Sequence, residues 1–198
     1  FAFQADEFPY NGIYQLQRDQ PLGSDNDLYE LRVDAPGYDP VFATQFMPEA
    51  VPLLEAKYLL DSSFDEFGEQ VSEITFTFQD PPGENFYAFE VSVLVYTIIG
   101  QDTLLGTDRV PLSSLDPLVE QGNEELIAGD EQFDGEETTL TFITDGRYTS
   151  GGDAEVKMMF NLISITEDRY RYSRAIQAAF NNQDNPFSEP SEIPSNVI

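Results

Sequence analysis

Hydrophobic and polar residues alternate along several stretches of this 198-residue chain, and a period of two residues predicts β-strands. The clearest alternation runs from Val71 to Gln79, where Ile74, Phe76 and Phe78 fall on one face. Residues 85–99 form the longest apolar stretch, and their β-branched and aromatic side chains favour a strand over a helix. The same reasoning predicts further strands at residues 10–17, 28–33, 40–46, 53–60, 138–143 and 154–164.

The hydrophobic period changes near the C-terminus. Thr166 followed by two acidic residues is typical of a helix start, because threonine caps free N–H groups and acids stabilise the first turn. We predict a helix over residues 166–181, ended by the Asn185–Pro186 pair. A short helix is also expected near Leu115 to Gln121, and residues 62–68 are expected to form a loop.

These elements predict an all-β, sandwich-like fold with one C-terminal helix. Residues 1–47 are interpreted as the closing strands of a small N-terminal sandwich. Residues 48–52 carry two prolines and are interpreted as an extended linker. Residues 53–183 then form a second, β-rich domain that includes the helix, and residues 184–198 form an extended tail.

The net charge of the chain indicates more about its partners and its environment than its length does. The 37 acidic and 9 basic residues give a formal net charge of −28, which disfavours contact with nucleic acid or anionic membrane surfaces. The acids are dispersed, which favours adaptation to high salt over a calcium-loaded protein with clustered carboxylates. Disorder is a third interpretation of such a charge, but the strand patterns oppose it for most of the chain.

The absence of two residue types excludes whole classes of chemistry. The chain contains no cysteine and no histidine, so Ser-His-Asp and Cys-His catalysis and histidine-ligated metals are excluded for this segment. No run of 18 apolar residues is present. The first residues do not resemble a native start, so we expect the chain to be a processed or truncated piece of a longer protein.

Several short motifs, taken in order, resemble a known family. The resemblance covers nearly the whole chain, and the order of the motifs is more specific than any one of them. The motifs are residues 33–38, the proline linker, residues 78–87, residues 133–135, residues 164–172, residues 185–190 and the Ser195-Asn196 pair. On these motifs the chain resembles a Bacteroidota outer-membrane lipoprotein family, domain-of-unknown-function family 4249.

The resemblance implies a lipid-anchored protein on the extracellular side of the outer membrane. It also implies that residues 1–47 close an immunoglobulin-like domain, and that the partner is a TonB-dependent, SusC-like transporter. No catalytic residues are established in this family. The chain departs from the family pattern at both ends: the signal peptide, the lipid-bearing cysteine and the early strands are missing, and so is the usual glycine-rich ending.

Two acidic clusters have oxygen ligands of the kind that calcium prefers. One contains Asp25, Asp27 and Glu30. The other spans residues 130–137, and its candidate metal ligands are Asp130, Asp134 and Glu136. Neither cluster has the spacing of an EF-hand, and a solvated acidic loop is the preferred interpretation. Paired carboxylates are also the machinery of glycoside hydrolysis, but nothing in the sequence singles out one pair.

One cluster combines basic and aromatic residues, and it lies on the predicted helix. Tyrosine and arginine are common interface anchors, so these residues are candidates for partner binding. The preferred alternative is structural, with tyrosines packing the helix on the sheet and arginines pairing with acids such as Glu167 and Asp168. The candidates for partner binding are Arg169, Tyr170, Tyr172, Arg174 and, in the tail, Phe187.

The sequence and the resemblance together favour a non-catalytic accessory or binding lipoprotein of the cell surface, without a cofactor other than possible Ca²⁺. One alternative is a structural or adhesive surface subunit that assembles through exposed strand edges. A second alternative is a carboxylate-dependent hydrolase.

Overall fold

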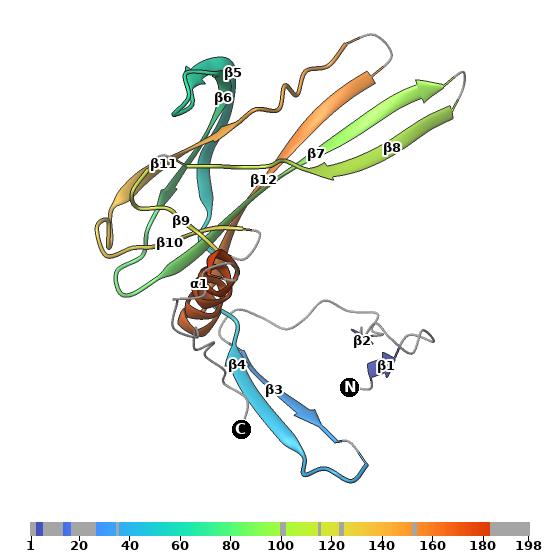
Figure 1. Ribbon diagram of the computed structural model, residues 1–198, viewed down its shortest axis with the longest axis vertical. Coiled ribbons are helices and arrows are strands. Elements are labelled where there is room, and N and C mark those ends of the chain that lie inside the picture. The colour runs from blue at the N-terminus through green and yellow to red at the C-terminus, as the bar shows by residue number, and fades with distance from the viewer. Residues whose placement is uncertain are drawn as a thin grey trace.

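β-strands dominate the computed structural model of the chain (Figure 1). The structure describes residues 27–34, 36–99, 102–114, 116–122, 125–151 and 154–182, together with two short strands near the N-terminus. These two strands, β1 (Phe3–Ala5) and β2 (Tyr14–Leu16), pair antiparallel. The strand predicted over residues 10–17 is confirmed at Tyr14–Leu16, and its remaining residues lie outside the described part, as does the predicted tail.

A three-stranded antiparallel sheet forms one layer of a sandwich. It contains β5 (Leu53–Phe64), β6 (Gln70–Gln79) and β11 (Glu137–Thr144), in the order β11-β6-β5. In β6, Ile74, Phe76 and Phe78 are fully buried, which confirms the face predicted from the alternation.

A five-stranded antiparallel sheet forms the other layer. Its central strand is β7 (Phe86–Ile99), and β12 (Ala154–Ile165) pairs with one edge of β7 along most of its length. The other edge is shared: β10 (Leu126–Gly129) pairs with Phe86–Phe89, and β8 (Asp102–Arg109) pairs with Ser92–Ile99. A short strand, β9 (Glu120–Gln121), extends the sheet beyond β10. The sheet therefore forks between β10 and β8.

Aromatic rings from both sheets meet in the core of the sandwich. Phe76 from β6 packs edge-on against Phe89 of β7, with ring centroids 5.5 Å apart, and against Phe142 of β11 at 5.3 Å. Phe78 packs against Tyr87 at 5.0 Å. Edge-to-face and tilted pairs of this kind add to the free energy of burial. The packing confirms the expected all-β, sandwich-like fold.

The helix α1 (Glu167–Asn181) covers the end of the five-stranded sheet on the face opposite the sandwich core. Thr166 is its N-cap and accepts a hydrogen bond from the Arg169 N–H, as predicted. The ring of Tyr170 lies 4.8 Å from that of Phe86, beside Ile127 and Ile165. The expected single C-terminal helix is therefore confirmed.

A two-stranded hairpin lies beside the helix, away from the sandwich (Figure 1). It consists of β3 (Leu28–Val33) and β4 (Val41–Phe46). Gln45 joins it to the start of α1, because its side-chain amide donates to Oγ1 of Thr166 at 2.9 Å. Both predicted strands are confirmed, whereas the division of the chain at residues 48–52 and the immunoglobulin-like origin of residues 1–47 stay predictions.

Two expectations about local structure are wrong, and two strands were missed. Residues 116–121 contain no helix: residues 117–118 form a turn, and Glu120 and Gln121 pair with β10 as β9. Pairing with a neighbouring strand overrides the weak helical pattern there. The expected loop at residues 62–68 begins later, because β5 continues to Phe64 after a bulge in which Asp61 has a φ of 51°. Strands β8 and β10 were not predicted at all.

Candidate functional site

Three of the basic and aromatic residues of α1, Arg169, Tyr170 and Arg174, contact the β9–β10 hairpin. Arg169 forms an ion pair with Glu125 at 2.7 Å, and Arg174 forms one with Glu120 at 2.6 Å. The guanidinium of Arg174 also lies 5.5 Å from the centre of the Tyr170 ring. The sequence placed the arginine partners on the helix itself, but only Arg171, paired with Glu167, follows that pattern.

Tyr170 fixes the helix to the sheet. Its side chain is buried, and its hydroxyl donates to Oε1 of Glu120 at 2.8 Å. Burial is the main cause that raises the pKa of Tyr170 to about 12, and the bond to Glu120 adds to it. Tyr172, in contrast, is exposed, and Phe187 lies outside the described residues. Partner binding by these residues stays a prediction.

The β9–β10 hairpin approaches α1 closely at one point. Ser173 is buried and donates to Oε1 of Glu125 at 2.8 Å, while Oε2 of Glu125 receives Arg169. A Cβ atom at Gly122 would lie 3.2 Å from side-chain carbons of Ser173 and Ile127, so glycine permits this approach. Glu125 is therefore a structural anchor that sequence reasoning missed.

Three carboxylates meet where the β6–β7 turn contacts the β10–β11 turn. Oxygen atoms of Asp80, Asp130 and Asp134 lie within 4.8 Å of one another, and the first two residues are buried. We call these three residues the carboxylate clasp. Two of the predicted metal ligands belong to it, whereas Glu136 is exposed and contributes only its backbone carbonyl, to the Asp80 N–H. Asp80 was missed because it lies 50 residues earlier in the chain.

Each carboxylate of the clasp accepts hydrogen bonds from the opposite turn. Asp134 accepts from the Gly83 N–H at 2.7 Å, and Asp130 accepts from the Asn85 N–H at 2.7 Å. Asp80 accepts from the Gly135 N–H at 2.8 Å and, at its other oxygen, from the Tyr87 hydroxyl. Gly83 and Gly135 both have positive φ, a conformation in which glycine carries no steric penalty.

These bonds give the clasp a structural role. Burial raises the pKa of Asp80, and the hydrogen bond from Tyr87 opposes that shift. Its carboxylate oxygens hold the two turns together, a role that neither interpretation of the sequence, a solvated acidic loop or a cation site, included. Calcium binding by Asp130, Asp134 and Glu136 therefore stays a prediction.

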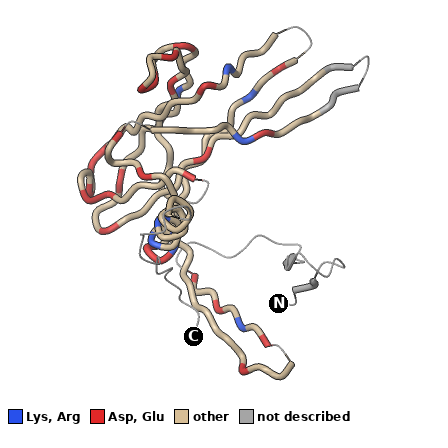
Figure 2. The backbone as a smooth tube through the Cα atoms, viewed as in Figure 1, with Lys and Arg blue, Asp and Glu red and all other residues tan. Residues whose placement is uncertain are grey.

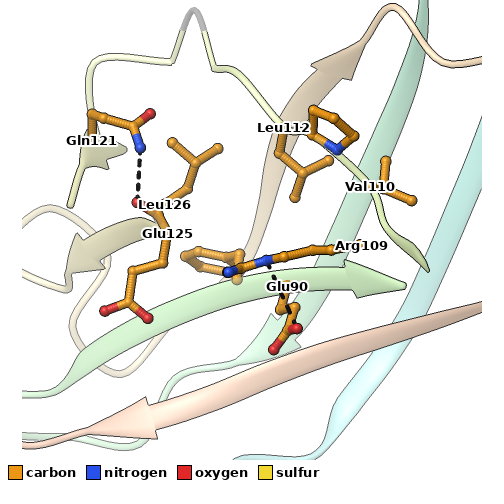
Figure 3. Close-up of a pocket in the computed structure, with 9 residues that line it drawn as sticks. Glu90, Arg109, Val110, Leu112, Gln121, Glu125 and Leu126 are labelled. Atoms are coloured by element: carbon orange, nitrogen blue, oxygen red, sulfur yellow. Dashed lines mark hydrogen bonds and ion pairs between the residues drawn. The ribbon is translucent and has the colours of Figure 1, made fainter. Parts of the chain in front are cut away.

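A cavity of about 270 Å³ lies at the fork of the five-stranded sheet (Figure 3). Its walls come from β7, from the segment that follows β8, and from the β9–β10 hairpin. We call it the fork pocket. Its lining residues are Phe89, Glu90, Arg109, Val110, Pro111, Leu112, Gln121, Glu125 and Leu126.

The β3–β4 hairpin presents an apolar face. Tyr29, Leu31 and Val33 on β3 lie on the same face as Val41 and Ala43 on β4, because these residues are directly paired or separated by two. Leu31, Val33 and Val41 are each at least 40% exposed. The hairpin therefore leaves much of its apolar side-chain surface exposed.

The fold and these sites define an all-β, sandwich-like protein with one C-terminal helix, an apolar hairpin and a pocket at a sheet fork. The family model described as "Domain of unknown function (DUF4249)" matches residues 11–198, and the chain belongs to that family. No curated protein and no solved structure matches the chain. Among the described residues, none of the helical structure is long and apolar enough to cross a bilayer.

Proposed function

We propose that this protein is a non-catalytic accessory or binding lipoprotein of the bacterial cell surface. In this proposal it belongs to Bacteroidota, is anchored to the outer membrane by a lipid outside this segment, and associates with a TonB-dependent, SusC-like transporter. The chain belongs to the family that its motifs resemble. That resemblance implies a lipid anchor, the outer membrane and a transporter partner, so family membership supports the proposal. The lack of histidine and cysteine in the chain removes the commonest nucleophilic mechanisms.

The observation that carries the proposal is the β3–β4 hairpin. Among the described residues it forms a sheet of only two strands, and a hairpin of that size is marginally stable in water by itself. Its apolar face, with Leu31 at 44%, Val33 at 45% and Val41 at 40% exposure, is the kind of surface that a protein partner covers. An envelope protein can bury this face and extend the sheet by adding a strand.

We expect a charge on this face to weaken the association strongly. Leu31→Glu places a carboxylate where the partner buries a leucine, and burying an unpaired charge is costly, so captured transporter falls at least about tenfold. The measurement is affinity capture of the tagged full-length protein from native membranes, with the barrel protein identified and quantified by mass spectrometry.

Leu54→Glu is the matched control. Leu54 lies on β5 and is similarly exposed, at 53%, but outside the hairpin. Capture by this variant is expected to stay within about twofold of the parent. Failure to recover any barrel protein, or equal losses for the two variants, would contradict the proposal.

The hairpin also supports a second candidate, a structural or adhesive subunit that assembles with copies of itself. An apolar, two-stranded sheet can pair with another copy as readily as with a transporter. Size-exclusion chromatography in concentrated salt separates the two, because a subunit of this kind elutes as a concentration-dependent polymer rather than as a monomer or a defined complex.

A saline habitat is part of the proposal, and it predicts salt-dependent stability. Acidic residues are spread over the hairpin and both sheets, while three of the basic residues gather on α1 (Figure 2). Raising NaCl from about 0.1 M to about 1 M shortens the Debye length from about 10 Å to about 3 Å and screens the self-repulsion. We expect the thermal midpoint to rise by about 5 °C or more.

A second measurement, with calcium in place of added NaCl, tests the alternative that the acidic residues bind calcium. The midpoint is measured at about 0.1 M NaCl with and without about 1 mM CaCl₂, which changes the ionic strength little. An increase with CaCl₂ alone, and none with NaCl, would replace salt adaptation by the calcium interpretation.

A further inference from the structure

The fork pocket lies where β7 changes partner along one edge. β10 covers that edge up to Phe89, and β8 covers it from Ser92 onward. Between them, the Val110 N–H is the only backbone group of the described residues that bonds to this edge, donating to the Val91 carbonyl at 2.8 Å. The sheet is therefore open at this point, and the opening leads from the outer face of the sheet toward the sandwich core.

The pocket has an apolar inner end and a polar mouth. Phe89, Val110 and Leu126 belong to the buried core cluster and are at most 4% exposed. Glu90 and Arg109 lie on the outer face of the sheet, and their side chains are 33% and 47% exposed. A molecule that fits this arrangement has a compact apolar group and a polar end.

Two of the polar groups at the mouth are already engaged. The carboxylate of Glu125 receives Arg169 and Ser173, both from α1. The side-chain amide of Gln121 donates to the backbone carbonyls of Gly122 and Glu125, as Figure 3 shows for the second bond. The groups that remain at the mouth are those of Arg109 and Glu90.

Arg109 is held more loosely than any other basic residue that the structure describes. The Nε atom of its guanidinium lies 3.8 Å from Oε1 of Glu90 (Figure 3). The guanidinium makes no hydrogen bond with any described residue. The other seven ion pairs in this part of the chain have nitrogen–oxygen distances of 3.4 Å or less. In a chain with 37 acids and 9 bases, an arginine whose one ion pair is as long as 3.8 Å is unusual.

The chemistry of a guanidinium decides which polar end the pocket accepts. Its planar set of five N–H donors matches a carboxylate, which it binds through two parallel hydrogen bonds. Because Glu90 approaches Nε, the two terminal nitrogens of Arg109 are left for such a pair.

We propose that the fork pocket binds a small carboxylate with a compact apolar group of about the size of a leucine or phenylalanine side chain. The apolar group enters the fork beside Phe89, Val110 and Leu126, and the carboxylate pairs with Arg109. A benzene ring fits a cavity of about 150 Å³, so 270 Å³ accommodates this group and part of its polar end. Both the C-terminus of a peptide and a free carboxylic acid have this chemistry. The site is separate from the β3–β4 hairpin, so it does not depend on the proposed function.

The test uses four probes that share a phenyl group, with the intact chain. N-acetyl-phenylalanine mimics a peptide C-terminus, 3-phenylpropanoate is a free acid, N-acetyl-phenylalaninamide lacks the carboxylate, and 2-phenylethylamine reverses the charge. Each is titrated in about 1 M NaCl, where the Debye length of about 3 Å screens the acidic surface. Methyl NMR signals of Val110, Leu112 and Leu126 report occupancy of the pocket.

We expect the two carboxylates to shift these signals with a dissociation constant on the order of 1 mM, as suits ligands of about 11–15 heavy atoms. The amide and the amine are expected to bind at least about tenfold more weakly, because they lose the pair with Arg109. Tighter binding of N-acetyl-phenylalanine than of 3-phenylpropanoate indicates a peptide terminus as the source, and the reverse indicates a free acid.

Arg109→Gln is expected to weaken carboxylate binding at least about tenfold and to leave amide binding unchanged. Arg147→Gln is the matched control, since Arg147 is also exposed and paired with Asp61 but does not line the pocket. Equal binding of acid and amide, preference for the amine, or no effect of Arg109→Gln would overturn the proposal. So would the absence of any shift at Val110, Leu112 and Leu126.

Discussion

Replacing Phe76 by alanine is expected to lower the free energy of unfolding by about 3–5 kcal/mol. Phe76 is fully buried at the centre of the sandwich, and its ring contacts Phe89, Phe142 and Phe160 from three other strands. Truncation removes apolar surface from the core and leaves a cavity that rings held by two sheets cannot close. Equilibrium urea unfolding, followed by far-ultraviolet circular dichroism, measures the change.

Phe67→Ala is the matched control for that measurement. Phe67 is 81% exposed in the turn after β5, so the same truncation there is expected to change stability by less than about 0.5 kcal/mol. A loss below about 1 kcal/mol for Phe76→Ala would mean that the two sheets do not share this core.

Removing the hydroxyl of Tyr87 is expected to cost about 1–3 kcal/mol. Tyr87 and Asp80 are both buried, and the Tyr87 hydroxyl is the only donor to Oδ1 of Asp80 among the described residues. Tyr87→Phe leaves that oxygen buried without a donor, while the ring keeps its packing against Phe78. Urea unfolding of the variant at about pH 7 gives the loss.

The loss is expected to depend on pH in a defined direction. Burial raises the pKa of Asp80 in the folded state, so Asp80 favours folding below its unfolded pKa and loses that contribution as pH rises through the folded pKa. The Tyr87 hydrogen bond limits the shift, and its removal raises the folded pKa of Asp80 further. Tyr87→Phe is therefore more destabilising at about pH 7 than at about pH 4.

Two variants make this comparison specific to the clasp. Tyr38→Phe removes a hydroxyl from an 80% exposed side chain and is expected to have no measurable effect at either pH. In an Asp80→Asn background, the loss caused by Tyr87→Phe is expected to become independent of pH over this range, because residue 80 no longer titrates. A pH dependence that persists in that background would assign the effect to another group.

Regular local patterns were read correctly from the sequence. The alternation in β6 identified Ile74, Phe76 and Phe78 as core residues, because a strand surface repeats every two residues. Thr166 marked the start of α1, because N-cap chemistry depends only on residues within the first turn. Elements with weak patterns were missed: β8 contains a glycine at its centre, and β10 has only four residues.

The carboxylate clasp shows why a site can be missed in the sequence even when the motifs that contain its residues are recognised. The motif over residues 78–87 and the motif over residues 133–135 both contributed to the family resemblance. The structure brings them together, since Asp80 and Tyr87 come from the first, and Asp134 and Gly135 come from the second. The sequence offered only a solvated acidic loop, or less favourably a cation site, at residues 130–137, because nothing local indicates that Asp80 lies beside them.

The sequence by itself determined the β-rich fold, the buried face of β6, the C-terminal helix and the acidic character of this protein. These properties depend on side-chain periodicity, on capping within one helical turn and on composition. All three can be evaluated without knowing which segments of the chain are in contact in the folded protein. Only the tertiary structure decided that Arg169 and Arg174 pair with Glu125 and Glu120, and that Asp80 completes the clasp. The fork pocket likewise exists because β8 and β10 share one edge of β7, and strand partners are chosen by contacts between residues far apart in the chain.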